Sequence, residues 1–190
     1  LGLHQRATGA PHAATILASA PDTTAPTMWL PQRLPWNPGG KGAGAMWGWP
    51  GGTGADMTQD FWVWTFAHDV SGVDTVRLVY RVDADGTNPI ASVQNETYAG
   101  GAEVGAWQTA GMTRRVFPKT NVFNNPSINF TVLPTVIADE WYAHVTGLTD
   151  VLVDYYCEAV DHNGRIRRSP IQHVWVGASS VTPTMAVEPP

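Results

Sequence analysis

The residues best suited to binding chemistry are tryptophans in a glycine-rich stretch, 41–54 (KGAGAMWGWPGGTG). Trp47 and Trp49 lie among glycines, which weaken a buried strand but allow a loop to present large flat rings. Sugars stack their C–H faces on such rings while their hydroxyls bind polar groups. We therefore expect a carbohydrate-binding platform at Trp47 and Trp49. The alternative is that these rings cap the open end of the domain or form a subunit contact.

Other parts of the chain supply further residues of the types that a sugar site needs. Two more tryptophans, Trp36 and Trp107, could widen the aromatic surface. Side-chain amides would bind the sugar hydroxyls. The candidates for this role are Gln32, Asn37, Gln94 and Gln108.

Closely spaced oxygen donors form a second candidate site, in the run 83–88 (DADGTN) followed by Asn95 and Glu96. Calcium takes six to eight oxygen ligands, so the composition of this run suits a calcium site. The expected metal ligands are Asp83, Asp85, Asn88 and Glu96. The spacing is not that of an EF-hand, and Asp-Gly is also a strong hairpin signal, so a simple turn is the alternative. Calcium here would pin the chain and take no part in chemistry.

Signatures of catalysis are missing from the sequence. It contains no G-x-S-x-G elbow, no H-E-x-x-H pair and no phosphate-binding loop. Its six histidines show no metal-ligand spacing, and His144 and His173 are expected to be structural. Asp139-Glu140 could be half of a glycosidase carboxylate pair, but a solvated strand start is the favoured interpretation. We therefore expect that the chain is not an enzyme.

Composition and charge exclude several classes of protein. A length of 190 residues suits one domain, and a net charge of −5 argues against a nucleic-acid partner. No run of apolar residues is long enough for a membrane-spanning helix. Cys157 is the single cysteine, so an intrachain disulfide and a thiolate metal cluster are both excluded. Cys157 is expected to be an inert core residue.

Alternating apolar residues, and not a helical period, dominate the middle of the chain. Strands are predicted over 61–66, 73–82, 141–145, 151–159 and 171–176. The run FWVWTF places Trp62, Trp64 and Phe66 on one face of its strand, and we assign Trp62 and Trp64 to the core. Asn163-Gly164 provides a tight turn before the next strand. The pattern predicts an all-β protein, an antiparallel β-sandwich.

Composition also divides the chain into a domain and two extended ends. Residues 1–27 are rich in Ala, Thr and Pro and are expected to form an arm or linker, and residues 179–190 a tail. The segment 14–18 (ATILA) could pair with a neighbour's sheet edge, which would suit a structural subunit or spacer. Residues 83–140 are expected to be a long insertion. The chain begins with Leu1 and shows no signal peptide, so we expect a processed protein or a piece of a longer one.

Two segments resemble a known class of module. The first, from Asp69, reads D-x-S-G-V and continues to V-R-L-V-Y-R; the second, from Tyr155, reads Y-Y-x-E-A-x-D-x-x-G. Together they resemble the immunoglobulin-like and fibronectin-III-like modules of large bacterial extracellular proteins. This resemblance implies an immunoglobulin-like sandwich over residues 28–178. The long insertion and the Trp-rich loop depart from an ordinary module of that class.

Four shorter segments carry a second resemblance: 35–40 (PWNPGG), 85–89 (DGTNP), 94–98 (QNETY) and 169–174 (SPIQHV). They resemble an accessory domain of secreted carbohydrate-active enzymes, of the alpha-amylase type in glycoside hydrolase family 57. The resemblance implies a non-catalytic accessory module and does not name a ligand. Our own expectation is an extracellular module whose partner is a polysaccharide, an α-glucan. The sugar-binding residues would then be Trp36, Trp47, Trp49, Trp107, Gln94 and Gln108. The alternative is a subunit of an extracellular assembly whose partners are neighbouring copies of the same chain.

Overall fold

The computed structural model describes residues 21–43, 53–83, 94–116 and 138–179, and for 42–43 and 53–55 it describes the backbone alone. Every regular element in these ranges is a strand, which confirms the all-β prediction, and none is a helix that could span a membrane. One sheet, the β5 sheet, contains β1 (Thr27–Met28), β2 (Gln32–Leu34), β5 (Phe61–His68), β9 (Asp139–Val145) and β8 (Thr113–Arg115). The other, the β10 sheet, contains β11 (Ile166–Arg168), β12 (Gln172–Val176), β10 (Val151–Asp161), β6 (Val73–Val82) and β7 (Gln108–Gly111). A separate hairpin joins β3 (Lys41–Ala43) to β4 (Thr53–Asp56).

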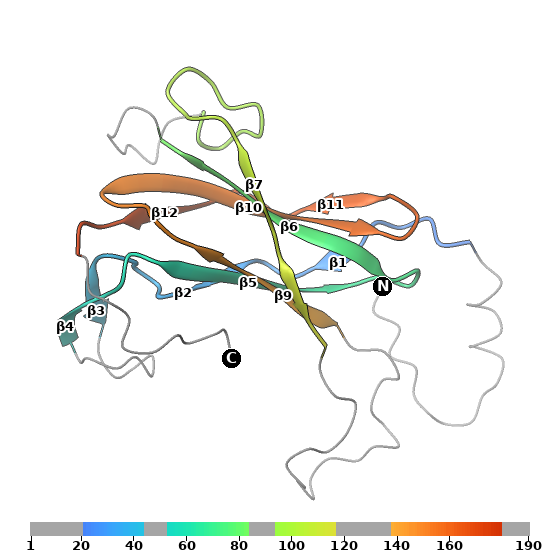
Figure 1. The fold of residues 1–190 in the computed structure, drawn as a ribbon. Helices are drawn as coiled ribbons and strands as arrows, with labels where there is room; N and C mark the ends of the chain where they lie inside the picture. The colour runs from blue at the N-terminus through green and yellow to red at the C-terminus, as the bar shows by residue number, and fades with distance from the viewer. Residues whose placement is uncertain (1–20, 44–52, 84–93, 117–137, 180–190) are drawn as a thin grey trace, which may run out of the picture.

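The two sheets form the layers of an antiparallel sandwich, as Figure 1 shows. Within the β5 sheet the order is β1-β5-β9-β8, with β2 also paired to β5. Within the β10 sheet the order is β11-β10-β6-β7, with β12 also paired to β10. One hydrophobic core lies between the layers, because alternate residues of each strand point inward. Cys157 is fully buried in this core, so the prediction of a core cysteine is confirmed, and burial raises the pKa of its thiol.

The assignment of Trp62 and Trp64 to the core was wrong. Both tryptophans are half-exposed in β5. The buried side chains of that strand are Phe61, Val63, Thr65 and Ala67. Their face of the strand is the outer one. Both faces of FWVWTF are apolar, so alternation located the strand but left open which face packs against the β10 sheet. Phe61 and Val63 fill the core, and the larger rings lie outside.

The chain crosses from one layer to the other inside the predicted insertion 83–140. In that stretch β7 pairs with β6 of the β10 sheet, and β8 pairs with β9 of the β5 sheet. Only Met112 separates the two strands, and its side chain enters the core. Figure 1 shows this crossing at the front of the molecule. The stretch therefore contributes an edge strand to each sheet.

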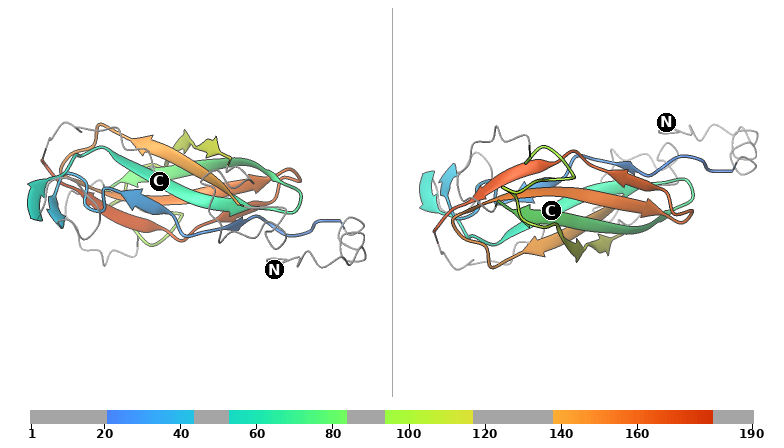
Figure 2. Two further views of the ribbon diagram at one scale, coloured as in Figure 1. Left: turned by 90° about the horizontal axis from the view of Figure 1, so that it is seen from below. Right: turned by 90° about the horizontal axis from the view of Figure 1, so that it is seen from above.

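The two ends of the sandwich differ. The views in Figure 2 show the β3–β4 hairpin at one end and the residues that precede β1 at the other. At the second end, Gly72 of the β5–β6 turn and Gly164 of the predicted Asn-Gly turn have φ of 93° and 79°. These values lie in the left-handed region that glycine adopts without strain. The tight turn predicted at Asn163-Gly164 is therefore confirmed.

At the hairpin end, two chain segments approach closely at glycines. The N–H of Gly177 donates to the carbonyl of Pro38 at 2.8 Å, and a Cβ built on Gly177 would lie 2.3 Å from the carbonyl oxygen of Gly39. We expect Gly177→Ala to lower the free energy of unfolding by about 1–3 kcal/mol, because the backbone must shift to admit the methyl group. Urea unfolding would measure this loss. The control is Gly111→Ala in β7, where a Cβ meets nothing within 4 Å; equal stability of the two variants would contradict the prediction.

Candidate functional site

The outer face of the β5 sheet carries a group of rings, here called the outer aromatic row: Trp62, Trp64, Tyr142 and His144. The register pairs Trp62 with His144 and Trp64 with Tyr142, so all four side chains lie on the same face of two adjacent strands. The rings of Trp62 and His144 are stacked, with centroids 4.1 Å apart and planes 10° apart. The ring of Tyr142 lies 5.7 Å from that of Trp62. His144 is exposed and the other three are half-exposed, so the row faces outward.

Neighbouring strands widen this face with polar and apolar side chains. Gln32 of β2 is paired with Trp64, and Thr113 of β8 is paired with Tyr142. Along the same face of β5, Phe66 meets the edge of Trp29, a ring that is largely exposed. An aromatic surface bordered by an amide and a hydroxyl can stack on an apolar ring face while it binds hydroxyl groups at the rim.

The carboxylates of Asp139 and Glu140 are each paired with an arginine. Glu140 Oε2 accepts from Arg115 Nη1 at 3.0 Å, and Asp139 Oδ2 accepts from Arg114 Nε at 2.8 Å. Glu140 is fully buried, so the favoured interpretation of a solvated strand start was wrong for this residue. The reason is that the side chain of Arg115, its partner in the register, lies beside it on the sheet. Adjacent residues of a strand point to opposite faces, so the two carboxylates do not act on one substrate.

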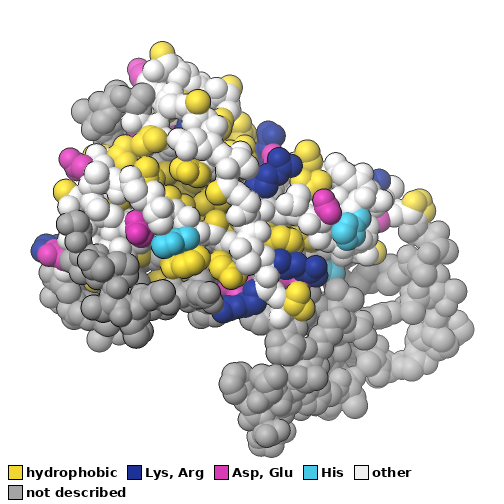
Figure 3. Space-filling model, in the orientation of Figure 1, with side chains coloured by type: hydrophobic (Ala, Val, Ile, Leu, Met, Phe, Trp, Pro, Cys, Tyr) yellow, Lys and Arg dark blue, Asp and Glu magenta, His cyan; other side chains and the backbone are white. Residues whose placement is uncertain are grey.

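Two of the predicted sugar-binding residues, Trp107 and Gln94, come together on the outer face of the β10 sheet. The indole N–H of Trp107 donates to the carbonyl of Tyr98 at 2.7 Å, and its ring lies 4.0 Å from the guanidinium of Arg81. Gln94 Oε1 accepts the N–H of Glu103 at 3.0 Å. These contacts hold the segment 94–107 against the sheet. In the space-filling view, hydrophobic side chains gather beside this segment and charged ones are scattered around them (Figure 3).

The other predicted sugar-binding residues lie elsewhere. Gln108 is paired with Tyr80, so its side chain points to the same face of the sheet as Tyr80. Trp107 covers Arg81, which points to the opposite face. Gln108 and Trp107 therefore do not form one surface. Trp36 is 70% exposed in the turn after β2, and its ring lies 4.4 Å from the guanidinium of Arg33. Trp47 and Trp49 lie outside the described residues. Asn37 donates to the carbonyl of Lys41 within its own turn.

The predicted calcium ligands are described only in part. Asp83 Oδ2 accepts from Asn95 Nδ2 at 3.2 Å, and Glu96 Oε1 pairs with His173 Nε2 at 3.2 Å. Asp85 and Asn88 lie outside the described residues. Both described carboxylates are engaged by neighbouring side chains, and calcium binding by these four residues stays a prediction.

A buried ion pair fixes the segment 94–107 to the β10 sheet. Arg81 Nε lies 2.9 Å from Asp154 Oδ2, and the two side chains are 1% and 0% exposed. The guanidinium also donates to the carbonyl of Gln94 at 2.7 Å, and Asn95 Nδ2 donates to Asp154. Burial alone would raise the pKa of Asp154, but hydrogen bonds from His173, Arg81 and Asn95 hold it below its ordinary value. The charge of Asp154 is therefore kept inside the protein by three donors.

The histidine of this network makes stability depend on pH. The pKa of His173 is raised above its ordinary value, chiefly by the hydrogen bond to Asp154 at 2.8 Å. A raised pKa contributes stability that is complete below about pH 6.5 and is lost as the pH rises through the folded-state pKa. We expect the Tm of the protein to fall as the pH rises above about 6.5, and to fall less in His173→Gln. Differential scanning calorimetry would measure both.

The control for this prediction is His162→Gln. The side chain of His162 is exposed and lies 3.6 Å from Asp74, which is also exposed. Exposed pairs contribute little to stability, so this variant should keep the pH dependence of the unchanged protein. An identical fall in Tm for the His173 variant and the unchanged protein would contradict the prediction.

Comparison with known proteins gives one relative by sequence. No family model matches the chain. An alpha-amylase of Niallia circulans is 31% identical in an alignment 176 residues long, which covers 84% of this chain and 13% of that protein. A solved structure, the cycloalternan-degrading enzyme from Trueperella pyogenes in complex with a covalent intermediate, matches 61% of this chain and 13% of its own, with 13% identity and a TM-score of 0.36. The chain thus spans about an eighth of each protein it matches. The resemblance to an alpha-amylase that four short segments indicated extends over most of the sequence.

Proposed function

We propose that this chain is a non-catalytic accessory module of an extracellular carbohydrate-active protein, and that it binds an α-glucan on the outer aromatic row. The observation that carries the proposal is the outward-facing set of rings on β5 and β9. The similarity to a short part of an alpha-amylase supports the choice of an α-glucan as the ligand. The proposal moves the sugar site from the predicted loop tryptophans to Trp62, Trp64 and Tyr142.

The spacing of the rings suits a chain of sugar units. Trp62 and Trp64 are two residues apart on one face, which places their Cα atoms roughly 7 Å apart along the strand. Two successive sugar units could therefore each contact one indole. Gln32, Thr113 and His144 lie at the rim, where amide, hydroxyl and imidazole groups would bind sugar hydroxyls.

The strand order supports an immunoglobulin-like module. The β5 sheet has the order of the ABED sheet of that fold, with β1 and β2 in the place of strand A. The β10 sheet has the order of the GFC sheet with β7 added at the edge. Sandwiches of this class occur as repeated or appended domains in larger proteins. A similarity that covers 13% of an alpha-amylase fits an appended domain of that size.

The pairing of the carboxylates beside the outer aromatic row supports a binding role without catalysis. Among the described residues of β8 and β9, Asp139 and Glu140 are each paired with an arginine and point to opposite faces. Hydrolysis of a glycosidic bond ordinarily needs two carboxylates that flank the same bond. The proposal therefore assigns this face to binding.

Affinity gel electrophoresis tests the function. The purified chain should migrate more slowly in a native gel that contains soluble starch than in one without it, and a gel with hydroxyethyl cellulose, a β-glucan, should leave its mobility unchanged. Unchanged mobility in starch together with a ladder of larger species would contradict the proposal and favour an assembly subunit. Residues 27–28 pair with β5 of their own chain, and the rest of the arm that would cross to a neighbour lies mainly outside the described residues.

A further inference from the structure

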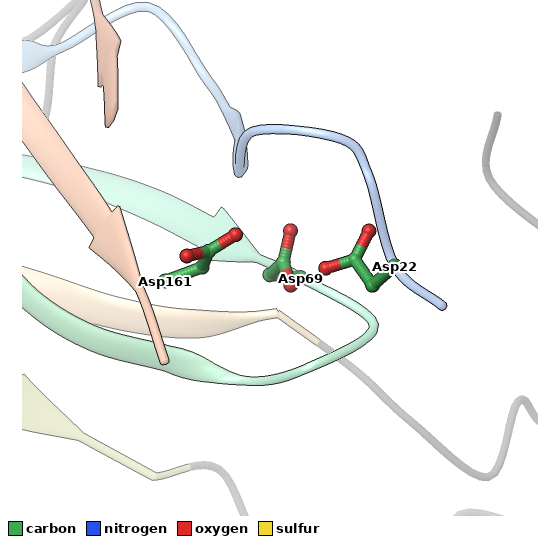
Figure 4. A group of neighbouring side chains, drawn as sticks. All are labelled: Asp22, Asp69 and Asp161. Atoms are coloured by element: carbon green, nitrogen blue, oxygen red, sulfur yellow. The ribbon is translucent and has the colours of Figure 1, made fainter. Parts of the chain in front are cut away.

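Three aspartates from separate parts of the chain meet at the end of the sandwich opposite the β3–β4 hairpin. Asp22 precedes β1, Asp69 begins the turn after β5, and Asp161 ends β10. One carboxylate oxygen of each lies within 4.8 Å of the others. Figure 4 shows the three side chains directed toward one another, with Asp69 between the other two. This group is here called the aspartate triad, and it is distinct from the run 83–88 in which the sequence predicts calcium.

Each carboxylate of the aspartate triad uses one oxygen, Oδ1, to accept N–H groups of its own turn. The backbone donors, with their distances, are Thr24 (3.0 Å), Ser71 (2.8 Å), Asn163 (2.8 Å) and Arg165 (2.7 Å). These bonds hold the three side chains in place. They also leave the second oxygen of each carboxylate to be satisfied in some other way.

Two of these second oxygens have no hydrogen-bond partner although they are shielded from solvent. They are Oδ2 of Asp22 and Oδ2 of Asp161, and the whole Asp161 residue is 1% exposed. The nearest described cation to Asp161 Oδ2 is Nη1 of Arg165 at 3.8 Å, which is too far for a hydrogen bond. A buried carboxylate oxygen without a partner is costly, and it indicates a ligand that the protein chain does not supply.

The charge of the aspartate triad also needs a cation. One carboxylate oxygen of each aspartate lies within 4.8 Å of the others, and the cation that the described residues bring to this group is the guanidinium of Arg165, 3.8 Å from Asp161 Oδ2. Like charges this close repel each other unless a positive charge lies among them.

We propose that the aspartate triad binds a calcium ion through one oxygen of each of Asp22, Asp69 and Asp161. Calcium lies about 2.4 Å from its oxygen ligands, so two of its ligands are at most about 4.8 Å apart, and the three carboxylate oxygens lie within that limit. Calcium also accepts irregular geometry and completes its shell with water or carbonyl oxygens. A site made of an exposed segment and two turns suits these properties better than the strict octahedron of magnesium.

The ion would fasten the N-terminal segment to the body of the sandwich. Asp22 lies on that segment, whereas Asp69 and Asp161 belong to turns of the two sheets. Two further contacts act nearby: Arg167 Nε donates to the carbonyl of Pro26 at 3.3 Å, and β1 pairs with the end of β5. Calcium would therefore set the direction in which the chain enters the domain from its N-terminal side.

Calorimetric titration of the EDTA-treated protein with CaCl2 tests the site. We expect one ion per chain with a Kd of about 10⁻⁴–10⁻³ M or tighter, and weaker binding of MgCl2. Asp22→Asn and Asp161→Asn should each weaken calcium binding at least tenfold, because they remove a ligand charge and keep Oδ1 as a hydrogen-bond acceptor. Calcium should raise the Tm of the unchanged protein and not that of Asp22→Asn.

The matched control is Asp150→Asn, which removes the same charge at the opposite end of β10. Asp150 is exposed and has a φ of 49°, a conformation that asparagine tolerates. This variant should bind calcium like the unchanged protein. Absence of calcium binding by the unchanged protein, or unchanged affinity in Asp22→Asn, would overturn the proposal. So would a loss of affinity in Asp85→Asn alone, which would assign calcium to the run 83–88.

Discussion

Replacing Trp62 with alanine is expected to weaken the binding of maltoheptaose about tenfold, which corresponds to about 1.4 kcal/mol. Trp62 is central to the outer aromatic row, because its ring contacts both His144 and Tyr142. Its removal therefore takes away one stacking surface and releases two others. Trp64→Ala should have a similar effect, and the double variant should show no measurable binding. Isothermal titration calorimetry measures each affinity.

The control for the tryptophan variants is Trp175→Ala. Trp175 is exposed to a comparable degree but belongs to β12, on the outer face of the other sheet. Because all three indoles lie outside the core, the variants should remain folded, and circular dichroism would verify this. If Trp175→Ala lost binding and Trp62→Ala kept it, the sugar site would lie on the β10 sheet and the assignment to the outer aromatic row would be contradicted.

Replacing Arg81 with methionine should lower the free energy of unfolding by about 3–5 kcal/mol. The substitution leaves the carboxylate of Asp154, which is 0% exposed, without its arginine. It also removes the donor to the carbonyl of Gln94 and the cation beneath Trp107. This is a large share of the 5–15 kcal/mol that stabilises a typical domain. Urea unfolding followed by tryptophan fluorescence would measure the loss.

Arg77→Met is the matched control on the same strand and the same face. Arg77 lies 3.7 Å from Glu158, but its side chain is 44% exposed. Glu158 is buried, but it keeps a shorter ion pair with Arg168 at 2.8 Å, so this variant should lose only about 0–1 kcal/mol of stability. If the two arginine variants unfolded at the same urea concentration, the buried pair would not be the attachment of segment 94–107 to the sheet.

The strands were predictable because their alternation is local, but the buried face of β5 was not. In β10, alternation places Tyr155 and Cys157 in the core, as expected. In β5, both faces carry mostly apolar side chains, and the choice between them depends on what the β10 sheet can accommodate. The sequence therefore predicted the strands that carry the outer aromatic row, but it did not predict that these side chains form an exposed surface.

Contacts between distant segments account for the rest of what the sequence did not predict. The alternation of β6 places Arg81 on the outer face of the sheet, where a charged residue is expected to be exposed. In the structure the segment 94–107 folds back over Arg81 and buries it. In the sequence, Asp69 and Asp161 are recognisable only as the first residues of two turn motifs, D-x-S-G and D-x-N-G. Because a hydrogen bond within each turn accounts for its aspartate, the sequence did not indicate that the two aspartates meet. Asp22 gave no signal, since a single acidic residue in a Pro- and Thr-rich segment indicates nothing until the fold places it.

The most direct test of the outer aromatic row is a ¹H–¹⁵N NMR titration of the chain with maltoheptaose, followed at the indole N–H signals of its nine tryptophans. Each signal reports on one ring, and single Trp→Phe variants assign them. We predict that the signals of Trp62 and Trp64 move with added sugar and that those of Trp107 and Trp175 stay in place. Movement confined to Trp36, Trp47 and Trp49, or no movement at any ring, would contradict the account.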